Sequence, residues 1–179
     1  MANSGLFLDR DGVINHDYGY VHLIKDFKFI DGIFKLVEQA VKKNYKIIVI
    51  TNQAGIGKGF YTEDTFLELN NWMCGVFSDY GAPLSQVYYC PNHPKGIGKY
   101  RKPDFRRKPS PGMLLEAQND FDLDLSSCVL IGDQKTDIEA GLSAGIGCNI
   151  LLDAESEDSG VHDSTYLQVS SLLEVIPMI

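Results

Sequence analysis

The chain has 179 residues, of which 44% are hydrophobic and 22% charged, and its formal net charge is -8. This length and balance are typical of one folded domain, so we expect residues 1–179 to form a single domain with its own core. The negative charge argues against a nucleic-acid-binding protein, which needs a basic surface. It still allows a local cluster of cations that would bind a small phosphorylated ligand.

Neither a secretory signal nor a membrane span is predicted. The first residues, MANSGLFLDRDG, lack a basic start and a long apolar run, and nowhere do about 18 apolar residues follow one another. Cys74, Cys90, Cys128 and Cys148 are widely spaced, as is typical of reduced thiols. We therefore expect a cytoplasmic protein, and we interpret it as a monomer.

Short apolar runs alternate along the chain with segments of helical periodicity. The apolar runs predict strands at 6–8, 46–51, 87–90, 129–132 and 148–152, and the periodic segments predict helices at about 33–44, 62–77, 111–119 and 136–144. The acidic and polar residues 153–164 are interpreted as a surface loop. The alternation indicates an α/β fold, in which a parallel sheet is covered by helices on both faces.

Polar side chains follow the main strands, at the edge where open α/β sheets bind their ligands. Asp9 and Asp11 come after the first strand, Thr51 ends the second, and Asp133 follows the fourth. Lys108 comes after the third strand, behind a proline-rich loop. Any one of these residues alone is more often a turn former or a helix cap. Their joint occurrence at successive strand ends points instead to one site.

The residue types at this edge fit a magnesium and phosphate site. Carboxylates are hard oxygen ligands that suit Mg²⁺, which also binds substrate phosphate. Asp9, Asp11 and Asp133 are the candidate ligands, supported by Asp137 one helical turn later. Lys108 would neutralise a phosphate and reduce the repulsion among the carboxylates.

Four motifs in chain order resemble those of the haloacid dehalogenase (HAD) superfamily of phosphotransferases. They are Asp9-x-Asp11-Gly, Thr51-Asn52, Lys108-Pro109 and Gly132-Asp133-x-x-x-Asp137. The resemblance covers about residues 5–152 and implies the Rossmann-like fold of that superfamily.

The resemblance also implies a role for each of these residues. Asp9 would be the nucleophile that forms an aspartyl-phosphate, and Asp11 the acid that protonates the leaving group and then the base that activates water. Mg²⁺ would be held by the Asp9 side chain, the Asp11 backbone carbonyl and Asp133. Thr51 and Lys108 would stabilise the phosphoryl oxygens.

Longer segments resemble, more narrowly, the D-glycero-D-manno-heptose 1,7-bisphosphate phosphatases. These segments are LDRDGVIN, the following DYGYV, TNQAGIGKGFYTE and RRKPSPGMLLEA. The resemblance implies removal of the C7 phosphate to leave heptose 1-phosphate, a step in the biosynthesis of nucleotide-activated heptose. The residues that it places against the sugar are Asp17, Tyr18, Gly19, Tyr20, Asn52, Gln53, Ala54 and Arg107.

Two alternatives stay open. The histidinol-phosphate phosphatases share the four motifs, so that enzyme or another small-molecule phosphomonoesterase is the first alternative. The second is a non-catalytic phospho-receiver domain, which also combines an acidic Mg²⁺ site with a threonine and a lysine. A receiver, however, carries its phospho-accepting aspartate at the end of a middle strand, and this chain has no aspartate at the end of its second strand.

The spacing between the motifs leaves no room for a separate cap domain, so we expect a capless enzyme in which the loop at 91–109 takes over part of the cap's role. Similar heptose phosphatases bind a structural zinc in this loop through Cys-x-His and Cys-x-Cys. The matching positions here read Cys90-Pro-Asn92 and Asp104-Phe-Arg106. One thiol does not make a tetrahedral zinc site, so no structural zinc is expected.

Two further expectations concern loops. Without zinc, we expect ion pairs such as Asp104 with a nearby arginine to order the loop at 91–109. The glycine-rich residues 53–60 are interpreted as a flexible flap over the sugar.

Overall fold

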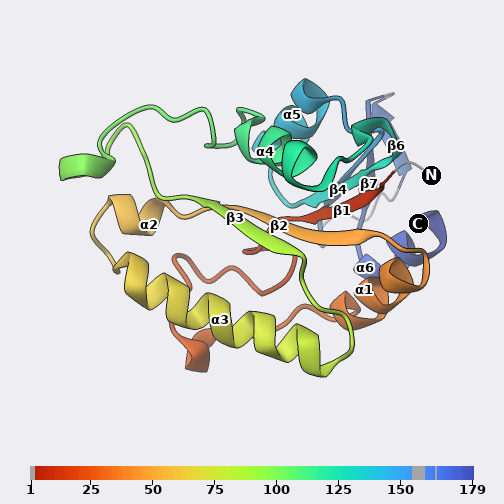
Figure 1. Cartoon of the computed structure of the whole chain (residues 1–179), viewed down its shortest axis with the longest axis horizontal. Helices are drawn as coiled ribbons and strands as arrows, with labels where there is room; N and C mark the ends of the chain where they lie inside the picture. The colour runs from red at the N-terminus through yellow and green to blue at the C-terminus, as the bar shows by residue number, and fades with distance from the viewer. Residues whose placement is uncertain (1–2, 155–159, 164) are drawn as a thin grey trace.

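In the described part of the chain, seven strands form one sheet in the order β3-β2-β1-β4-β5-β7-β6 (Figure 1). The computed structural model describes residues 3–154, 160–163 and 165–179. Neighbouring strands are parallel except for β6 and β7, which are antiparallel. The strands are β1 (Gly5–Leu8), β2 (Lys46–Asn52), β3 (Gln86–Cys90), β4 (Val129–Gly132), β5 (Cys148–Leu152), β6 (Gly160–Asp163) and β7 (Tyr166–Val169).

Helices cover both faces of the sheet, as the sequence predicts (Figure 1). One face carries α4 and α5, and the other carries α1, α3 and α6. The short helix α2 lies beyond the carboxyl end of β2. The helices are α1 (Ile33–Lys42), α2 (Ala54–Gly57), α3 (Glu63–Asp79), α4 (Gly112–Phe121), α5 (Lys135–Ala144) and α6 (Leu172–Val175).

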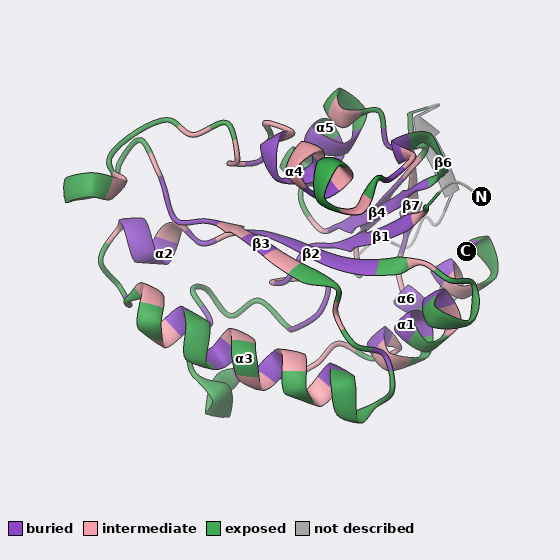
Figure 2. Cartoon of the chain, viewed as in Figure 1, coloured by how far each residue is buried: buried purple, intermediate pink, exposed green. Residues whose placement is uncertain are grey.

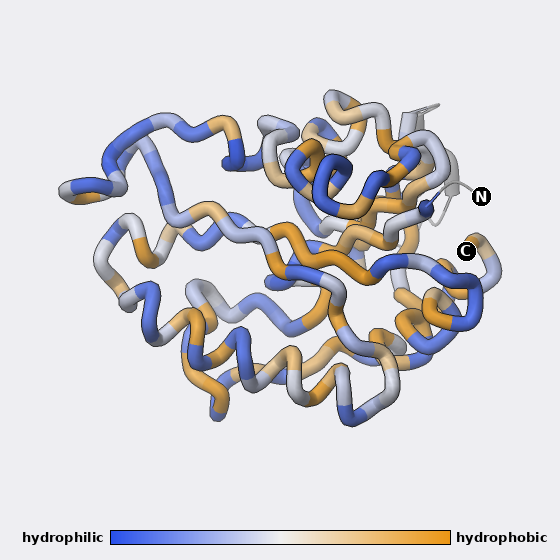
Figure 3. The backbone as a smooth tube through the Cα atoms, viewed as in Figure 1, coloured by the Kyte–Doolittle hydropathy of each residue, from blue (hydrophilic) through white to orange (hydrophobic). Residues whose placement is uncertain are grey.

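The central strands are buried on both faces, because a helical layer covers each side of the sheet (Figures 2 and 3). In β2, residues 47–50 are at most 1% exposed. In β1, Leu6 and Leu8 pack into the core below α1 and α3, whereas Phe7 packs into the core below α4 and α5. This alternation fixes the register of β1 and so the position of Asp9, the next residue after it.

The helix α3 begins where the sequence predicts a cap. The Thr62 hydroxyl accepts a hydrogen bond from the Thr65 N–H at 3.1 Å, and Glu63 and Asp64 occupy the first turn. Acidic residues there interact favourably with the helix dipole. The buried side of the helix is formed by Phe66, Leu69, Met73 and Phe77.

The chain after residue 152 differs from the expectation of a simple surface loop. β6 occupies 160–163 and β7 and α6 follow, while residues 155–159 and 164 lie outside the described part. β7 pairs in parallel with β5, and α6 packs Leu172 and Val175 into the core. The sequence pattern did not reveal these elements because β6 (GVHD) and β7 (YLQV) contain no continuous apolar run and α6 is too short to show helical periodicity.

Between the first and last motifs, residues 9–137, no separate domain interrupts the sheet and its covering helices. The site is therefore capless, as predicted. In the part of the chain that the structure describes, no helix is long and apolar enough to cross a bilayer.

Candidate active site

A cavity of about 250 Å³ opens at the carboxyl ends of β1, β2 and β4. Tyr18 and Arg107 are the two predicted site residues that do not line it. Three lining residues were not predicted: Tyr61, Gln134 and Thr136. The predicted residues that line it are Asp9, Asp11, Asp17, Gly19, Tyr20, Thr51, Asn52, Gln53, Ala54, Lys108, Asp133 and Asp137.

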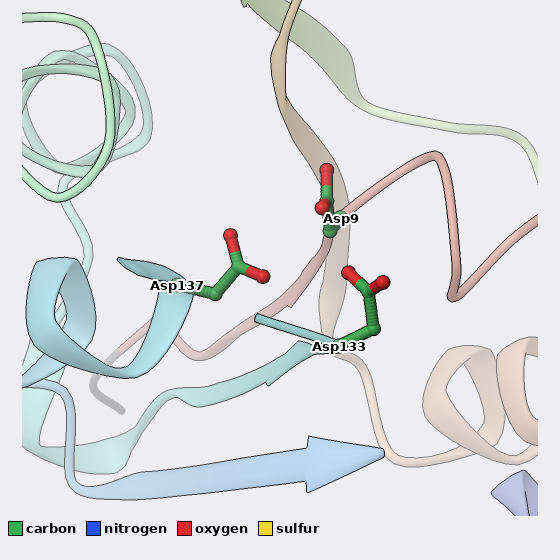
Figure 4. Close-up of side chains that lie close together, drawn as sticks. All are labelled: Asp9, Asp133 and Asp137. Carbon is green, nitrogen blue, oxygen red and sulfur yellow. The ribbon is translucent and has the colours of Figure 1, made fainter. Parts of the chain in front are cut away.

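Three carboxylates from different elements meet in this cavity (Figure 4). Asp9 follows β1, Asp133 follows β4, and Asp137 lies in the first turn of α5. One oxygen of each lies within 4.8 Å of an oxygen of the others. Such crowding is unfavourable unless a cation is shared among them.

Two glycines make room for this crowding. A Cβ atom at Gly12 would lie 2.2 Å from Asp133 Oδ2, and Gly12 also has φ +92°, a conformation that other residues rarely adopt. A Cβ atom at Gly132 would lie 2.2 Å from the Asp137 Cβ. The glycines in the first and fourth motifs are therefore needed to bring the acidic side chains together.

Lys108 is the buried cation of the cluster. Its Nζ lies 2.9 Å from Asp9 Oδ1 and 2.6 Å from Asp137 Oδ1, and it donates a hydrogen bond to the Ile50 carbonyl at 3.0 Å. Asn52 fixes the backbone of Lys108 through two hydrogen bonds, one to its carbonyl and one from its N–H. Asn52 of the second motif thus positions Lys108 of the third motif.

Burial raises the pKa of Asp9 well above its usual value, with Lys108 opposing this shift and Asp137 and Asp133 adding to it. Burial also raises the pKa of Asp133. For Lys108, burial lowers the pKa, but attraction to Asp9 and Asp137 outweighs it, so the pKa is raised overall. One ammonium among three carboxylates leaves the cluster with excess negative charge.

The oxygen atoms that remain free suit a divalent cation. Asp133 Oδ1 is buried and has no hydrogen-bond partner among the described residues. Asp137 is already engaged, since Oδ1 contacts Lys108 and Oδ2 accepts from the Gln134 N–H at 3.0 Å. Asp9 and Asp133 are therefore better placed than Asp137 to bind a metal, and their hard oxygens fit Mg²⁺.

The Asp11 side chain is held by its own set of hydrogen bonds, separate from those of the three carboxylates. Its Oδ1 accepts hydrogen bonds from Arg10 at 2.9 Å and Asn15 at 3.0 Å, and its Oδ2 accepts from Gln53 Nε2 at 3.1 Å. Arg10 is 1% exposed and also donates to the Val21 carbonyl at 2.6 Å. Neither Arg10 nor Asn15 was predicted from the sequence to be a partner of Asp11.

The segment after Asp11 forms one wall of the cavity. Asp17 accepts a hydrogen bond from the Gly19 N–H at 2.8 Å, and Tyr20 accepts one from Lys58 at 2.8 Å. Tyr18 points away from the cavity, since it is 62% exposed and stacks on His16. Only part of this segment therefore faces the cavity.

The loop at 91–109 contains no zinc site among the described residues. Asn92 Nδ2 donates to Asp104 Oδ2 at 2.5 Å, so the residues at two expected ligand positions bind each other. The neighbouring His93 Nδ1 is also engaged, because it accepts from the Lys95 N–H at 2.9 Å. That this loop binds no structural zinc stays a prediction.

The expected ion pair of Asp104 with an arginine side chain is not present. Asp104 Oδ1 accepts from the Arg106 backbone N–H at 2.8 Å, while the Arg106 guanidinium lies 3.0 Å from Glu116. Arg107 donates a long hydrogen bond, 3.4 Å, to the Asn92 carbonyl. Hydrogen bonds to the backbone and to an amide therefore replace the expected salt bridge.

The interpretation of residues 53–60 as a flexible flap is also wrong. Residues 54–57 form α2, in which Gly55, Ile56 and Gly57 are buried. A Cβ atom at Gly57 would lie 2.3 Å from the Pro91 carbonyl oxygen, so this glycine allows two backbones to pack closely. Glycines here serve packing as well as turning, a distinction that composition alone does not make.

Of the unpredicted lining residues, Gln134 and Thr136 lie inside the fourth motif, so its spacing was the signal that could have found them. Tyr61 lies inside the segment TNQAGIGKGFYTE, so the resemblance of that segment was the signal that could have found it. Its ring reaches the cavity by packing against Gly55 of α2.

Comparisons with known proteins agree with the geometry. The chain is 51% identical over 180 residues to the D-glycero-alpha-D-manno-heptose-1,7-bisphosphate 7-phosphatase of Burkholderia mallei, covering 100% of this chain and 95% of that protein. It is 41% identical to the D-glycero-beta-D-manno-heptose-1,7-bisphosphate 7-phosphatase of Haemophilus influenzae, covering 84% and 82%.

The family model and the solved structures support the same fold. A model described as HAD-hydrolase-like matches residues 105–171. The D,D-heptose 1,7-bisphosphate phosphatase of B. bronchiseptica, solved in complex with magnesium and phosphate, has a TM-score of 0.82 to this chain. That similarity covers 97% of both chains at 22% sequence identity.

These similarities decide among the alternatives that the motifs left open. They support neither a histidinol-phosphate phosphatase nor a phospho-receiver domain. An identity of 51% along the whole chain is far above what a shared fold alone requires. The chain belongs to the D-glycero-D-manno-heptose-1,7-bisphosphate 7-phosphatase family, within the HAD-like hydrolases.

Proposed function

We propose that this chain is a Mg²⁺-dependent phosphatase that removes the C7 phosphate of D-glycero-D-manno-heptose 1,7-bisphosphate and leaves heptose 1-phosphate. The reaction would serve the biosynthesis of nucleotide-activated heptose. The observation that carries the proposal is the buried cluster of three carboxylates and one lysine, in a chain 51% identical to a phosphatase named for this reaction.

Mg²⁺ would be held by the carboxylates of Asp9 and Asp133 and by the backbone carbonyl of Asp11. The unpartnered Asp133 Oδ1 supports this assignment, as does the magnesium in the complex of the B. bronchiseptica enzyme. When bound, the ion would neutralise the carboxylates and the charge that develops on the transferring phosphoryl group. Asp137 supports the site by holding Lys108.

The reaction would run in two steps. A carboxylate oxygen of Asp9 attacks phosphorus, and the bond from phosphorus to the sugar oxygen breaks as Asp11 gives that oxygen a proton. Water then attacks the aspartyl-phosphate, gives its proton to Asp11, and releases inorganic phosphate from Asp9. Thr51 and Lys108 would stabilise the phosphoryl oxygens in both steps.

The sugar would lie against the part of the wall formed by Asp17, Gly19 and Tyr20 and by residues 52–54, all of which line the cavity. Tyr18 and Arg107 lie outside the lining, so we assign them to the rim, where Arg107 would contribute positive charge to substrate recognition. We further propose that residues 1–179 act as one domain, as a monomer, in the cytoplasm.

The test is turnover of the α and β anomers of the heptose bisphosphate and of histidinol phosphate, each with and without Mg²⁺. We expect release of one phosphate per heptose bisphosphate, dependent on Mg²⁺, and little release from histidinol phosphate. A clear preference for histidinol phosphate would refute the proposed substrate. Turnover that continues in Asp9→Asn would refute Asp9 as the nucleophile.

A further inference from the structure

The hydroxyl group of Tyr61 points into the wall of the cavity, and none of the four motifs includes it. Tyr61 is 8% exposed, and its hydroxyl lies 2.5 Å from Oε1 of Gln53, which is 1% exposed. Gln53 Nε2 lies 2.8 Å from Thr51 Oγ1 and 3.1 Å from Asp11 Oδ2. One amide side chain thus connects a tyrosine to two residues of the proposed reaction.

The orientation of the Gln53 amide sets the direction of each hydrogen bond in this network. Its nitrogen faces Asp11 Oδ2 and Thr51 Oγ1, and in the second step of the reaction, where Asp11 acts as the base, the carboxylate can only accept from it. The amide oxygen faces Tyr61, whose phenol donates to it. Since Thr51 Oγ1 accepts from Gln53, the proton of the Thr51 hydroxyl is left available for a phosphoryl oxygen in the cavity.

The surroundings of Tyr61 hold its ring in this position. The ring stacks on His22, with centroids 4.8 Å apart and planes 4° from parallel. It also fills the space that a side chain at Gly55 would occupy, since a Cβ atom there would lie 2.2 Å from the ring. Burial raises the pKa of Tyr61 to about 12, so the phenol keeps its proton and remains a donor.

We propose that Tyr61 is a positioning residue: its hydroxyl sets the orientation of the Gln53 amide, and Gln53 in turn directs the Asp11 carboxylate and the Thr51 hydroxyl. This inference rests on the proposed function, in which Asp11 protonates the leaving group. It also changes the role of Gln53, whose amide is fully used inside the protein and does not primarily bind the sugar.

The competing explanation is that Tyr61 only fills the small core formed with Ile56 and Phe66. Tyr88 provides a matched control for it. Tyr88 is 6% exposed and its hydroxyl also donates to a side chain, Asp120 Oδ2, at 2.6 Å, but it does not line the cavity. Tyr61→Phe and Tyr88→Phe therefore each remove one hydrogen-bonded hydroxyl from a buried tyrosine.

The experiment compares kcat/KM for heptose bisphosphate and for p-nitrophenyl phosphate in the full chain with Mg²⁺. A sugar alkoxide needs a proton to leave, whereas p-nitrophenolate does not, so misplacing Asp11 affects the first substrate more. For Tyr61→Phe we expect kcat/KM to fall about tenfold on the heptose bisphosphate and about twofold on p-nitrophenyl phosphate. Tyr88→Phe should leave the ratio of the two values unchanged.

A second variant covers the case in which Tyr61→Phe folds poorly. Gln53→Met removes the amide and should reproduce the same substrate-dependent loss, and adding Tyr61→Phe to it should cause little further loss, because both act on one path. Equal losses on both substrates, or additive effects of the two substitutions, would overturn the proposal. Failure of the wild-type protein to hydrolyse heptose bisphosphate would instead refute the proposed function, and the ratio could then be measured on any alkyl phosphate that it hydrolyses.

Discussion

The strand ends of the sheet and the loop at 91–109 both border the active site, yet they are held together in opposite ways. At the strand ends, three carboxylates surround one buried ammonium group, Lys108. In the loop, Asn92 donates to Asp104, and the same carboxylate accepts from the Arg106 backbone N–H. The first region needs an added cation, whereas the second is satisfied by the chain's own groups.

The reason for this difference is burial. Asp9, Asp137 and Lys108 are at most 8% exposed, so their charges are poorly solvated and must be compensated locally. Asp104 is only partly buried, and although burial raises its pKa, its hydrogen-bond donors lower the pKa overall. A carboxylate that is this well solvated and hydrogen-bonded does not require a metal ion.

The largest expected effect comes from removing the central carboxylate of the cluster. Asp9→Asn should reduce kcat by at least about 10³-fold, because the amide cannot attack phosphorus. The same substitution should not destabilise the metal-free protein, since it removes a buried charge whose pKa is already raised. Steady-state kinetics and thermal unfolding in a chelator measure the two effects. A variant that lost activity because it was unfolded would contradict this prediction.

Removing Asp137, which holds Lys108 in the cluster, should mainly lower the stability of the fold. Asp137→Ala removes a partner of Lys108 and the acceptor for the Gln134 N–H, so we expect a loss of about 3 kcal/mol in the free energy of unfolding. Glu38→Ala, which breaks an exposed pair with Lys42, is the control and should cost far less stability. Chemical denaturation measures the free energy of unfolding of both variants. Equal losses in the two variants would show that burial does not make the Asp137 contacts stronger than the exposed pair.

Mg²⁺ should stabilise the protein more at high pH than at low pH. Asp9 and Asp133 have raised pKa values without metal, so the folded state binds more protons than the unfolded state and the metal-free protein loses stability as pH rises through that window. Binding of Mg²⁺ to the ionised carboxylates removes this cost. The increase in Tm on adding Mg²⁺ should therefore grow as pH rises through the range in which Asp9 and Asp133 lose their protons. A Tm increase that did not change with pH would contradict the assignment of Asp9 and Asp133 as the Mg²⁺ ligands.

The smallest expected effect concerns the loop. Asn92→Asp places two carboxylates against each other and should cost about 1 kcal/mol of stability, whereas the swapped pair Asn92→Asp with Asp104→Asn should recover most of it. Elemental analysis of the wild-type protein should find far less than one zinc per chain. A stoichiometric zinc would show that the loop, like the strand ends, depends on a metal.

The sequence was most informative where periodicity and residue type are local properties. The apolar run at 46–51 predicted a buried strand, and it forms β2, which lies between β3 and β1. The aspartates that follow β1 and β4 were predicted to meet, because parallel neighbouring strands bring their carboxyl ends to one edge. The elements after residue 152 were missed, because β6 and β7 mix polar and apolar residues and α6 is shorter than two helical turns.

Tertiary structure decided the contacts between segments that are distant in the sequence. Arg107 and Tyr18 were assigned to the site from resemblance to motifs, but the side-chain directions that exclude them from the cavity lining depend on how their loops pack. The pairing of Asn92 with Asp104 likewise depends on how a loop closes on itself. The sequence alone allowed several possible partners for each of these four side chains.

The sequence by itself therefore determined the α/β fold, the order of the motifs and the set of acidic residues that gather at one edge of the sheet. Only the tertiary structure showed which carboxylate oxygens remain free for a metal, with Asp137 engaged by Lys108 and Gln134 while Asp133 keeps an unpartnered oxygen. It alone placed Tyr61 against Gln53. The physical reason is that strand and helix patterns follow from neighbouring residues, whereas hydrogen-bond partners follow from distances that only packing sets.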